Sequence, residues 1–138
     1  MATPTDLVYN AARVLFANGA LDWPGQTINI GLVSGLYVPQ TTDEFVSSIP
    51  PGAFIVRDIA VSNLGVSAGG ACFGTIAEIE ALLSTLEVVG LVMYVQTGDD
   101  TTSNLVYYTS TGPGFPFLPV GFNYVIGYDQ TNGGFFQV

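Results

Sequence analysis

The chain has 138 residues, of which 49% are hydrophobic and only 9% are charged, and this length fits one domain spanning residues 1–138. Two basic residues, Arg13 and Arg57, stand against eleven acidic ones, and the net charge is -9. Nucleic acid and anionic membranes are therefore excluded as expected partners, because binding phosphate groups requires several Lys or Arg side chains.

Several residue types that catalysis and metal binding commonly use are missing. The chain contains no His, no Lys and a single cysteine, Cys72. Ser-His-Asp triads, His-ligated metals, four-cysteine zinc sites and P-loops each require residues that are absent here. We therefore expect a protein that is not an enzyme, with no catalytic residue, no cofactor and no metal. An internal disulfide is precluded as well.

The apolar excess predicts an interface. An average soluble domain has about 25% charged residues, and a domain of this size buries only about two-thirds of its unfolded surface. Some apolar surface is thus expected to stay outside, where it would contact a subunit or partner. The densest apolar run, residues 88–95, is far shorter than the roughly 20 residues of a membrane-spanning helix. A secretion signal is not expected, because the first twelve residues carry Asp6 and no base.

The N-terminal segment predicts one amphipathic helix over about residues 4–18. Thr3 is a favoured helix cap, Pro4 suits the first helical position, and Asn18-Gly19 is a typical helix end. Between them, apolar residues recur at spacings of three and four, at Leu7, Ala11, Val14 and Leu15.

From about residue 27 to residue 138 the pattern predicts a β-rich body. Ile28, Ile30 and Leu32 alternate with Asn29 and Gly31, which is typical of a half-buried strand. Further strands are predicted at 54–61, 71–76, 87–95, 105–109, 122–128 and 135–138. The expected fold is mainly β, an antiparallel β-sandwich or barrel-like domain with one N-terminal α-helix.

Four connecting segments have their own predictions. Residues 42–48 predict a short helical turn, and residues 97–104 predict a polar hairpin loop. Residues 120–138 predict a closing hairpin that turns at 129–134, where Asn-Gly and Gly-Gly favour a tight turn. Residues 77–86 have good helix propensity between two strands, so we favour a short second helix there, with strand pairing as the open alternative.

Acidic pairs and aromatic residues are the remaining candidates for chemistry. We interpret Asp43/Glu44, Glu78/Glu80 and Asp99/Asp100 as solvated surface charges rather than glycosidase carboxylates. The Asp99/Asp100 loop has oxygen ligands that suit Ca²⁺ but lacks the EF-hand spacing, and we interpret it as a turn; Ca²⁺ binding stays open. Trp23 and the seven tyrosines are expected to be core or interface anchors, with a sugar-binding platform as the alternative.

Six residues are predicted interface contacts. The Pro-rich segment 111–119 does not suit a central strand, so its large apolar residues either cover the core or insert into a neighbour. Arg57 and Asp58 are expected to point to opposite faces of a strand, leaving Arg57 to bind a carboxylate on a neighbouring strand or subunit in a bidentate contact. Arg13 is expected to act similarly. The full set is Arg13, Phe45, Arg57, Phe115, Phe117 and Leu118.

A series of short motifs extends along nearly the whole chain. They are Tyr9-Asn10-Ala11, Leu21-Asp22, Thr27-Ile28-Asn29-Ile30-Gly31-Leu32-Val33, Tyr37-Val38-Pro39, Asp43-Glu44-Phe45, Val92-Met93-Tyr94, Thr97-Gly98-Asp99-Asp100, Leu105-Val106-Tyr107 and Gly133-Gly134-Phe135-Phe136. In this order they resemble a family of small tailed-phage virion structural proteins. The chain differs from that family in having no Lys and in its Pro-rich segment 112–119.

The resemblance implies a non-enzymatic bacteriophage virion protein. Its expected role is that of a capsid decoration (cement) protein, which binds the major capsid protein across capsomer joints on the outside of the shell and stabilises it. It would be made in the host cytoplasm and form a homo-oligomer. The alternatives are a tail, collar or fibre-associated virion protein and, from a different class, a carbohydrate-binding module.

Overall fold

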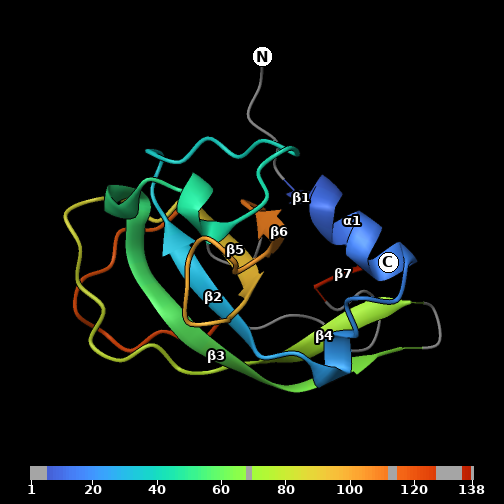
Figure 1. The fold of residues 1–138 in the computed structure, drawn as a ribbon. Helices are drawn as coiled ribbons and strands as arrows, with labels where there is room; N and C mark the ends of the chain where they lie inside the picture. The colour runs from blue at the N-terminus through green and yellow to red at the C-terminus, as the bar shows by residue number, and fades with distance from the viewer. Residues whose placement is uncertain (1–5, 68–69, 112–114, 127–134, 138) are drawn as a thin grey trace.

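The computed structural model describes residues 6–67, 70–111, 115–126 and 135–137. Within them, seven antiparallel strands form one curled, half-barrel sheet (Figure 1). The strand order is β1-β6-β5-β2-β3-β4-β7. This confirms the mainly β, barrel-like prediction. The strands are β1 (Asp6–Val8), β2 (Ile28–Val33), β3 (Phe54–Val66), β4 (Ala71–Ile76), β5 (Gly90–Val95), β6 (Leu105–Thr109) and β7 (Phe136–Gln137). One α-helix, α1 (Asn10–Ala17), and three short 3-10 turns complete the described part, at Trp23–Gly25, Val46–Ser48 and Pro51–Ala53.

The central strands are buried on both faces. β2 pairs with β3 on one side and with β5 on the other, and β5 pairs with β6. In β2 even Gly31 is buried, and β6 is buried along its whole length. The prediction of a half-buried strand at 28–32 was therefore wrong about its second face. Strands covered on both faces are typically continuous apolar runs, as β5 and β6 are.

Two hydrophobic cores cover the two faces of this sheet. The larger core contains Ile28, Ile30 and Leu32 from β2, together with Ala12 of α1 and Trp23. The smaller core lies on the other face, where the segment between β2 and β3 supplies its buried residues Tyr37, Val46, Ile49 and Ala53. That segment includes the predicted helical turn, which the structure forms as the 3-10 turn Val46–Ser48.

The predicted helix over residues 4–18 begins later than expected. Asp6, Leu7 and Val8 form β1, which pairs with β6 through Leu7 opposite Tyr108, and α1 follows at Asn10. Thr3 and Pro4 lie outside the described residues. Pairing with β6 buries Leu7, Val8 and Tyr9, so tertiary contacts override the local helical pattern. The predicted end is nearly correct, because Asn18 caps the helix.

No helix forms at residues 77–86. The segment is extended, and Ile79, Leu83 and Val88 form isolated bridges with Tyr124, Val120 and Phe117. A positive φ of 47° at Ala81 interrupts any helical repeat. The favoured helix is therefore wrong, and the segment pairs through isolated bridges with residues 117–124 rather than with either flanking strand.

Of the predicted closing hairpin, the described parts 120–126 and 135–137 show no pairing with each other. Tyr124 bridges to Ile79, whereas β7 pairs with β4 through Phe136 opposite Cys72. Both ends of the predicted hairpin thus find partners elsewhere in the chain, because each buries aromatic residues against the larger core. The predicted turn at 129–134 lies outside the described residues. By contrast, β5 and β6 pair directly, which confirms the hairpin around residues 97–104.

Within the described residues, none of the helical segments has the length and hydropathy that crossing a bilayer would need.

The close approach of Gly90 in β5 to Tyr108 in β6 gives a test of this packing. A Cβ atom on Gly90 would lie 2.6 Å from the Tyr108 hydroxyl and 2.7 Å from its ring. We expect Gly90→Ala to lower the free energy of unfolding by about 1–3 kcal/mol, the usual cost of overpacking. The matched control is Gly35→Ala, where nothing lies within 4 Å of the added Cβ. Urea unfolding of the two variants measures the difference, and equal stabilities would contradict this packing.

Candidate functional site

Two regions of the described structure group side chains that could contact a partner or fix the fold. The first is a polar network between β3 and the hairpin loop that follows β5, which we call the hairpin clamp; it consists of Arg57, Asp58, Tyr94, Gln96 and Asp100. The second is the pair of extended segments 77–89 and 115–126, which we call the apolar ribbon.

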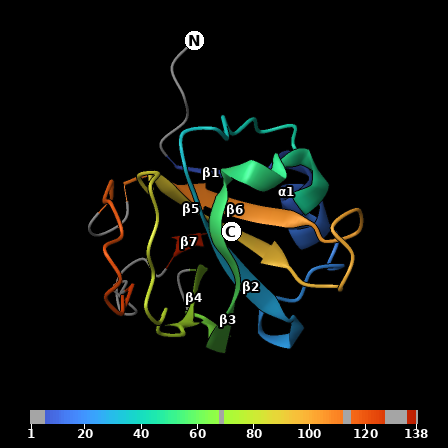
Figure 2. The same cartoon turned by 90° about the vertical axis from the view of Figure 1, so that its left-hand side faces the viewer.

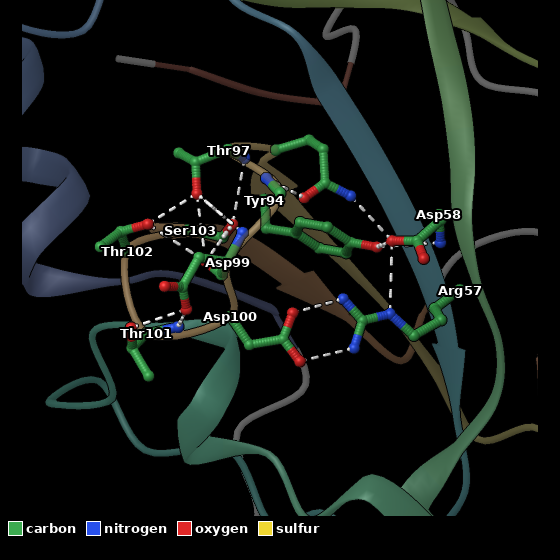
Figure 3. Close-up of polar contacts among 11 residues, drawn as sticks. Arg57, Asp58, Tyr94, Thr97, Asp99, Asp100, Thr101, Thr102 and Ser103 are labelled. Carbon is green, nitrogen blue, oxygen red and sulfur yellow. Dashed lines mark hydrogen bonds and ion pairs between the residues drawn. The ribbon is translucent and has the colours of Figure 1, made fainter.

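Arg57 is the centre of the hairpin clamp (Figure 3). Its Nη1 and Nη2 donate hydrogen bonds to the two carboxylate oxygens of Asp100, at 2.9 and 2.7 Å. The guanidinium also lies 5.0 Å from the ring centroid of Phe54 and 5.7 Å from that of Tyr94, within the range of cation–π attraction. The predicted bidentate contact forms, but its carboxylate lies on the hairpin loop of the same chain and not on a neighbouring strand or subunit. The ion pair holds the pKa of Asp100 below its usual value.

Asp58 joins the same network and corrects one prediction. Its φ is +62°, and the pairing of β2 with β3 is irregular at this point. This left-handed backbone brings the Asp58 carboxylate beside Arg57 instead of on the opposite face, with Arg57 Nε 3.3 Å from Oδ1. The same oxygen accepts hydrogen bonds from the Tyr94 hydroxyl at 2.6 Å and from Gln96 Nε2 at 2.9 Å. Burial and the bond to Asp58 raise the pKa of Tyr94.

The hairpin loop 97–104 is held by its own polar side chains. The Asp99 carboxylate accepts hydrogen bonds from the backbone N–H and the hydroxyl of Thr101, at 2.9 and 2.7 Å, and these bonds lower its pKa. The buried Ser103 hydroxyl donates to the Asp99 carbonyl at 2.9 Å. Asp99 therefore stabilises the turn while Asp100 binds Arg57, which supports the interpretation of this loop as a turn. Among the residues placed by the structure, no cluster of three metal-ligating side chains is present.

The aromatic residues proposed for sugar binding are mostly interior. Trp23 is 1% exposed, and its Nε1 donates a hydrogen bond to the carbonyl of Phe73 at 3.0 Å. Tyr9 and Tyr37 share a hydrogen bond of 2.7 Å between their hydroxyls, and Tyr37 donates to Asp43 at 2.8 Å. Such side chains present no open ring face to a sugar, which argues against that platform. The buried tyrosines are Tyr9, Tyr37, Tyr94, Tyr107 and Tyr108.

Cys72 is also interior. The residue is buried between β3 and β7, and desolvation raises the pKa of its thiol to about 11. Its reactive thiolate form is therefore scarce at neutral pH.

The two segments of the apolar ribbon lie side by side, drawn in yellow and orange-red in Figures 1 and 2. Ile79 and Tyr124 exchange backbone hydrogen bonds at 2.9 and 2.8 Å, and Val88 and Phe117 do so at 2.7 and 3.0 Å. The inner side chains, among them Ile79 and Val88, belong to the larger core. The ribbon thus covers one face of the sheet.

The outer side chains of the ribbon remain in solvent. Of the ten large hydrophobic residues that are exposed in the described chain, six belong to this ribbon, and they are between 42% and 73% exposed. Exposed large apolar side chains gathered on two bridged segments favour an interaction site. The six residues are Leu83, Leu86, Leu118, Val120, Phe122 and Val125.

The six predicted interface residues are spread over different surroundings. Phe115 and Phe117 are half-buried, stack at 6.0 Å and pack against the larger core, so they cover the core, whereas Leu118 beside them is exposed. Phe45 is half-buried and lines an open pocket of about 330 Å³ with Val14 and Leu15 of α1.

The two arginines also differ from each other. Arg57 binds Asp100 within the chain, as described above. Arg13 is exposed, and its Nε donates to the carbonyl of Val8 at 3.3 Å. Among the six predictions, only Leu118 lies on the outer face of the ribbon.

The sequence analysis missed most of the ribbon. The favoured helix at 77–86 hides Leu83 and Leu86, and the predicted closing hairpin at 120–138 hides Val120, Phe122 and Val125. A signal was present: Leu82 and Leu83 are adjacent, and in an extended segment adjacent side chains point in opposite directions. Leu82 is buried and Leu83 is exposed.

The hairpin clamp predicts a measurable coupling between Arg57 and Asp100. Since both side chains are partly exposed, at 29% and 47%, solvent screening limits their interaction to about 1 kcal/mol. We expect a double-mutant cycle of Arg57→Gln and Asp100→Asn, followed by chemical denaturation, to give this coupling. Asp22→Asn, at an exposed acid elsewhere, is the control and should leave stability unchanged. Additive effects of the two clamp mutations would contradict the clamp.

The same pair predicts a pH dependence. Asp100 has a lower pKa in the folded chain than in the unfolded chain, so its stabilisation is present above about pH 4 and is lost as the pH falls through the lowered pKa. We therefore expect the stability difference between wild type and Asp100→Asn to be constant from pH 5 to 7, on the scale of about 1 kcal/mol, and to vanish in strong acid. A difference that persists below the pKa of Asp100 would contradict an ionic origin.

When the chain was compared with protein-family models, with curated proteins and with solved structures, none of the three comparisons returned a match.

Proposed function

We propose that the chain is a non-enzymatic structural protein of a tailed-phage virion, which decorates the outside of the capsid shell and stabilises it by binding the major capsid protein across capsomer joints. The observation that carries the proposal is the apolar ribbon, a surface suited to binding another protein. The placement in a virion rests on the ordered sequence motifs that resemble small virion proteins.

The exposure of the ribbon is the first support. Monomeric soluble proteins seldom expose contiguous apolar patches without a function. Here the outer residues of two adjacent segments, including Leu83 and Phe122, are exposed together on a chain with few charges. Burying such side chains in a contact is the main favourable contribution to association.

The packing beneath the ribbon is the second observation that supports the proposal. Phe117 and Tyr124 pack against each other at 4.9 Å, and both contact the larger core. A surface anchored in this way loses little conformational entropy on binding, which favours affinity. A protein that strengthens a shell needs this property, because its contact surfaces must keep their positions under load.

Binding to capsid shells tests the proposal. The purified chain is mixed with empty expanded shells assembled from the major capsid protein of the same phage, and bound copies are counted by co-sedimentation and native mass spectrometry. We expect saturable, stoichiometric binding. Leu83→Ser with Phe122→Ser should weaken it by about tenfold or more, because central apolar anchors each contribute about 1–2 kcal/mol.

Two exposed apolar residues outside the ribbon provide the matched control. Leu36 and Val38 are 61% and 53% exposed in the segment between β2 and β3. Leu36→Ser with Val38→Ser should leave shell binding unchanged. A folded wild-type chain that ignores the shells would overturn the capsid assignment, and equal losses in both double variants would show that the ribbon is not the contact.

A further inference from the structure

The charges on the apolar ribbon have one sign. Glu78, Glu80 and Glu87 are exposed on the segment 77–89, next to the exposed leucines. Neither segment of the ribbon contains a basic residue. Asn123 Nδ2 donates a hydrogen bond to Glu78 at 3.2 Å, while no contact of the Glu80 or Glu87 carboxylate is seen within the described residues. The apolar surface is therefore bordered by negative charge.

Within the described residues, neither arginine lies on the ribbon to neutralise this border. Arg57 is bound by Asp100 and Asp58, and Arg13 lies on α1, outside the ribbon. In a two-fold contact between ribbons the same acidic patch would occur on both sides, and like charges brought together oppose association. A second copy of this chain is therefore a poor occupant of the ribbon.

We propose that the ribbon docks onto a different protein, whose apolar contact surface is bordered by Lys and Arg side chains. This inference rests on the proposed function and specifies the partner's chemistry: the coat-protein surface that receives the ribbon is apolar at its centre and basic at its edge. The outer leucines and Phe122 supply the buried centre, and Glu80 and Glu87 meet the basic edge. Complementary charge of this kind speeds association and selects the partner.

Two charge-neutralising double variants test whether the acidic border of the ribbon contributes to binding. Glu80→Gln with Glu87→Gln removes two ribbon charges, whereas Asp22→Asn with Glu44→Gln removes two exposed charges elsewhere. Both variants have the same net charge, so any difference in binding between them depends on where the removed charges lie. We expect the ribbon variant to bind capsid shells about fivefold more weakly at 50 mM NaCl, as two partly exposed ion pairs allow. The control should change binding by less than twofold, and 1 M NaCl should remove the difference, because salt screens exposed charges.

Beads of defined chemistry provide a second probe that does not depend on the capsid. Octylamine beads present an alkyl chain with a cation, octyl beads present the alkyl chain alone, and octanoate beads present it with an anion. Wild type should be retained best by octylamine. Both Glu80→Gln/Glu87→Gln and Leu83→Ser/Phe122→Ser should reduce that retention more than the control variant does.

The outcomes separate this inference from the proposed function. Shell binding that both charge variants weaken equally would retain the capsid assignment and overturn the basic-edged partner. Absence of shell binding would overturn the capsid assignment, and selective retention on octylamine would still support the partner chemistry. Equal retention of the two charge variants on octylamine would overturn the inference. So would a stable dimer that Leu83→Ser/Phe122→Ser dissociates, because the ribbon would then bind a second copy.

Discussion

The central strands β2, β5 and β6 are largely buried on both faces, and the arrangement of the other segments follows from the need to cover them. One face is covered by the segment between β2 and β3, which supplies the smaller core. The other face is covered by α1, Trp23, the curled end of the sheet and the ribbon. Their buried side chains form the larger core. Exposing such strands to water would destabilise a small domain, so both faces of the sheet need a cover. Loops and extended segments cover them here, as helices do in larger α/β proteins.

Using extended segments as a cover has a consequence for the surface. An extended chain presents side chains alternately inward and outward, so a cover rich in Leu, Val and Phe buries some of these residues and exposes others. Ile79 and Leu82 enter the core while Leu83 points to solvent. The same local sequence thus stabilises the fold and forms the surface that we propose as a docking site.

The hairpin clamp has a different role, since it ties a polar loop to the sheet. Arg57 and Asp58 of β3 bind Asp100, Tyr94 and Gln96 from the β5–β6 hairpin. Several hydrogen bonds that share Arg57 and Asp58 fix the position of the loop relative to β3. The hairpin clamp engages Arg57 in an intramolecular contact, and Arg13, the other arginine, lies on α1 away from the ribbon.

The sequence by itself determined the β-rich class and the positions of most strands, because these depend on local alternation. The scarcity of positive charge indicated a bidentate carboxylate contact for Arg57, but Asp100 as its partner is known only from the structure. The tertiary structure decided the rest. It converted residues 6–8 to a strand and residues 77–86 to a bridged segment, and it paired β7 with β4. Each of these outcomes depends on burial against residues distant in the chain, which a local pattern does not encode. The ribbon could not be identified from the sequence, because the exposure of its side chains depends on how the two segments pack in the folded molecule.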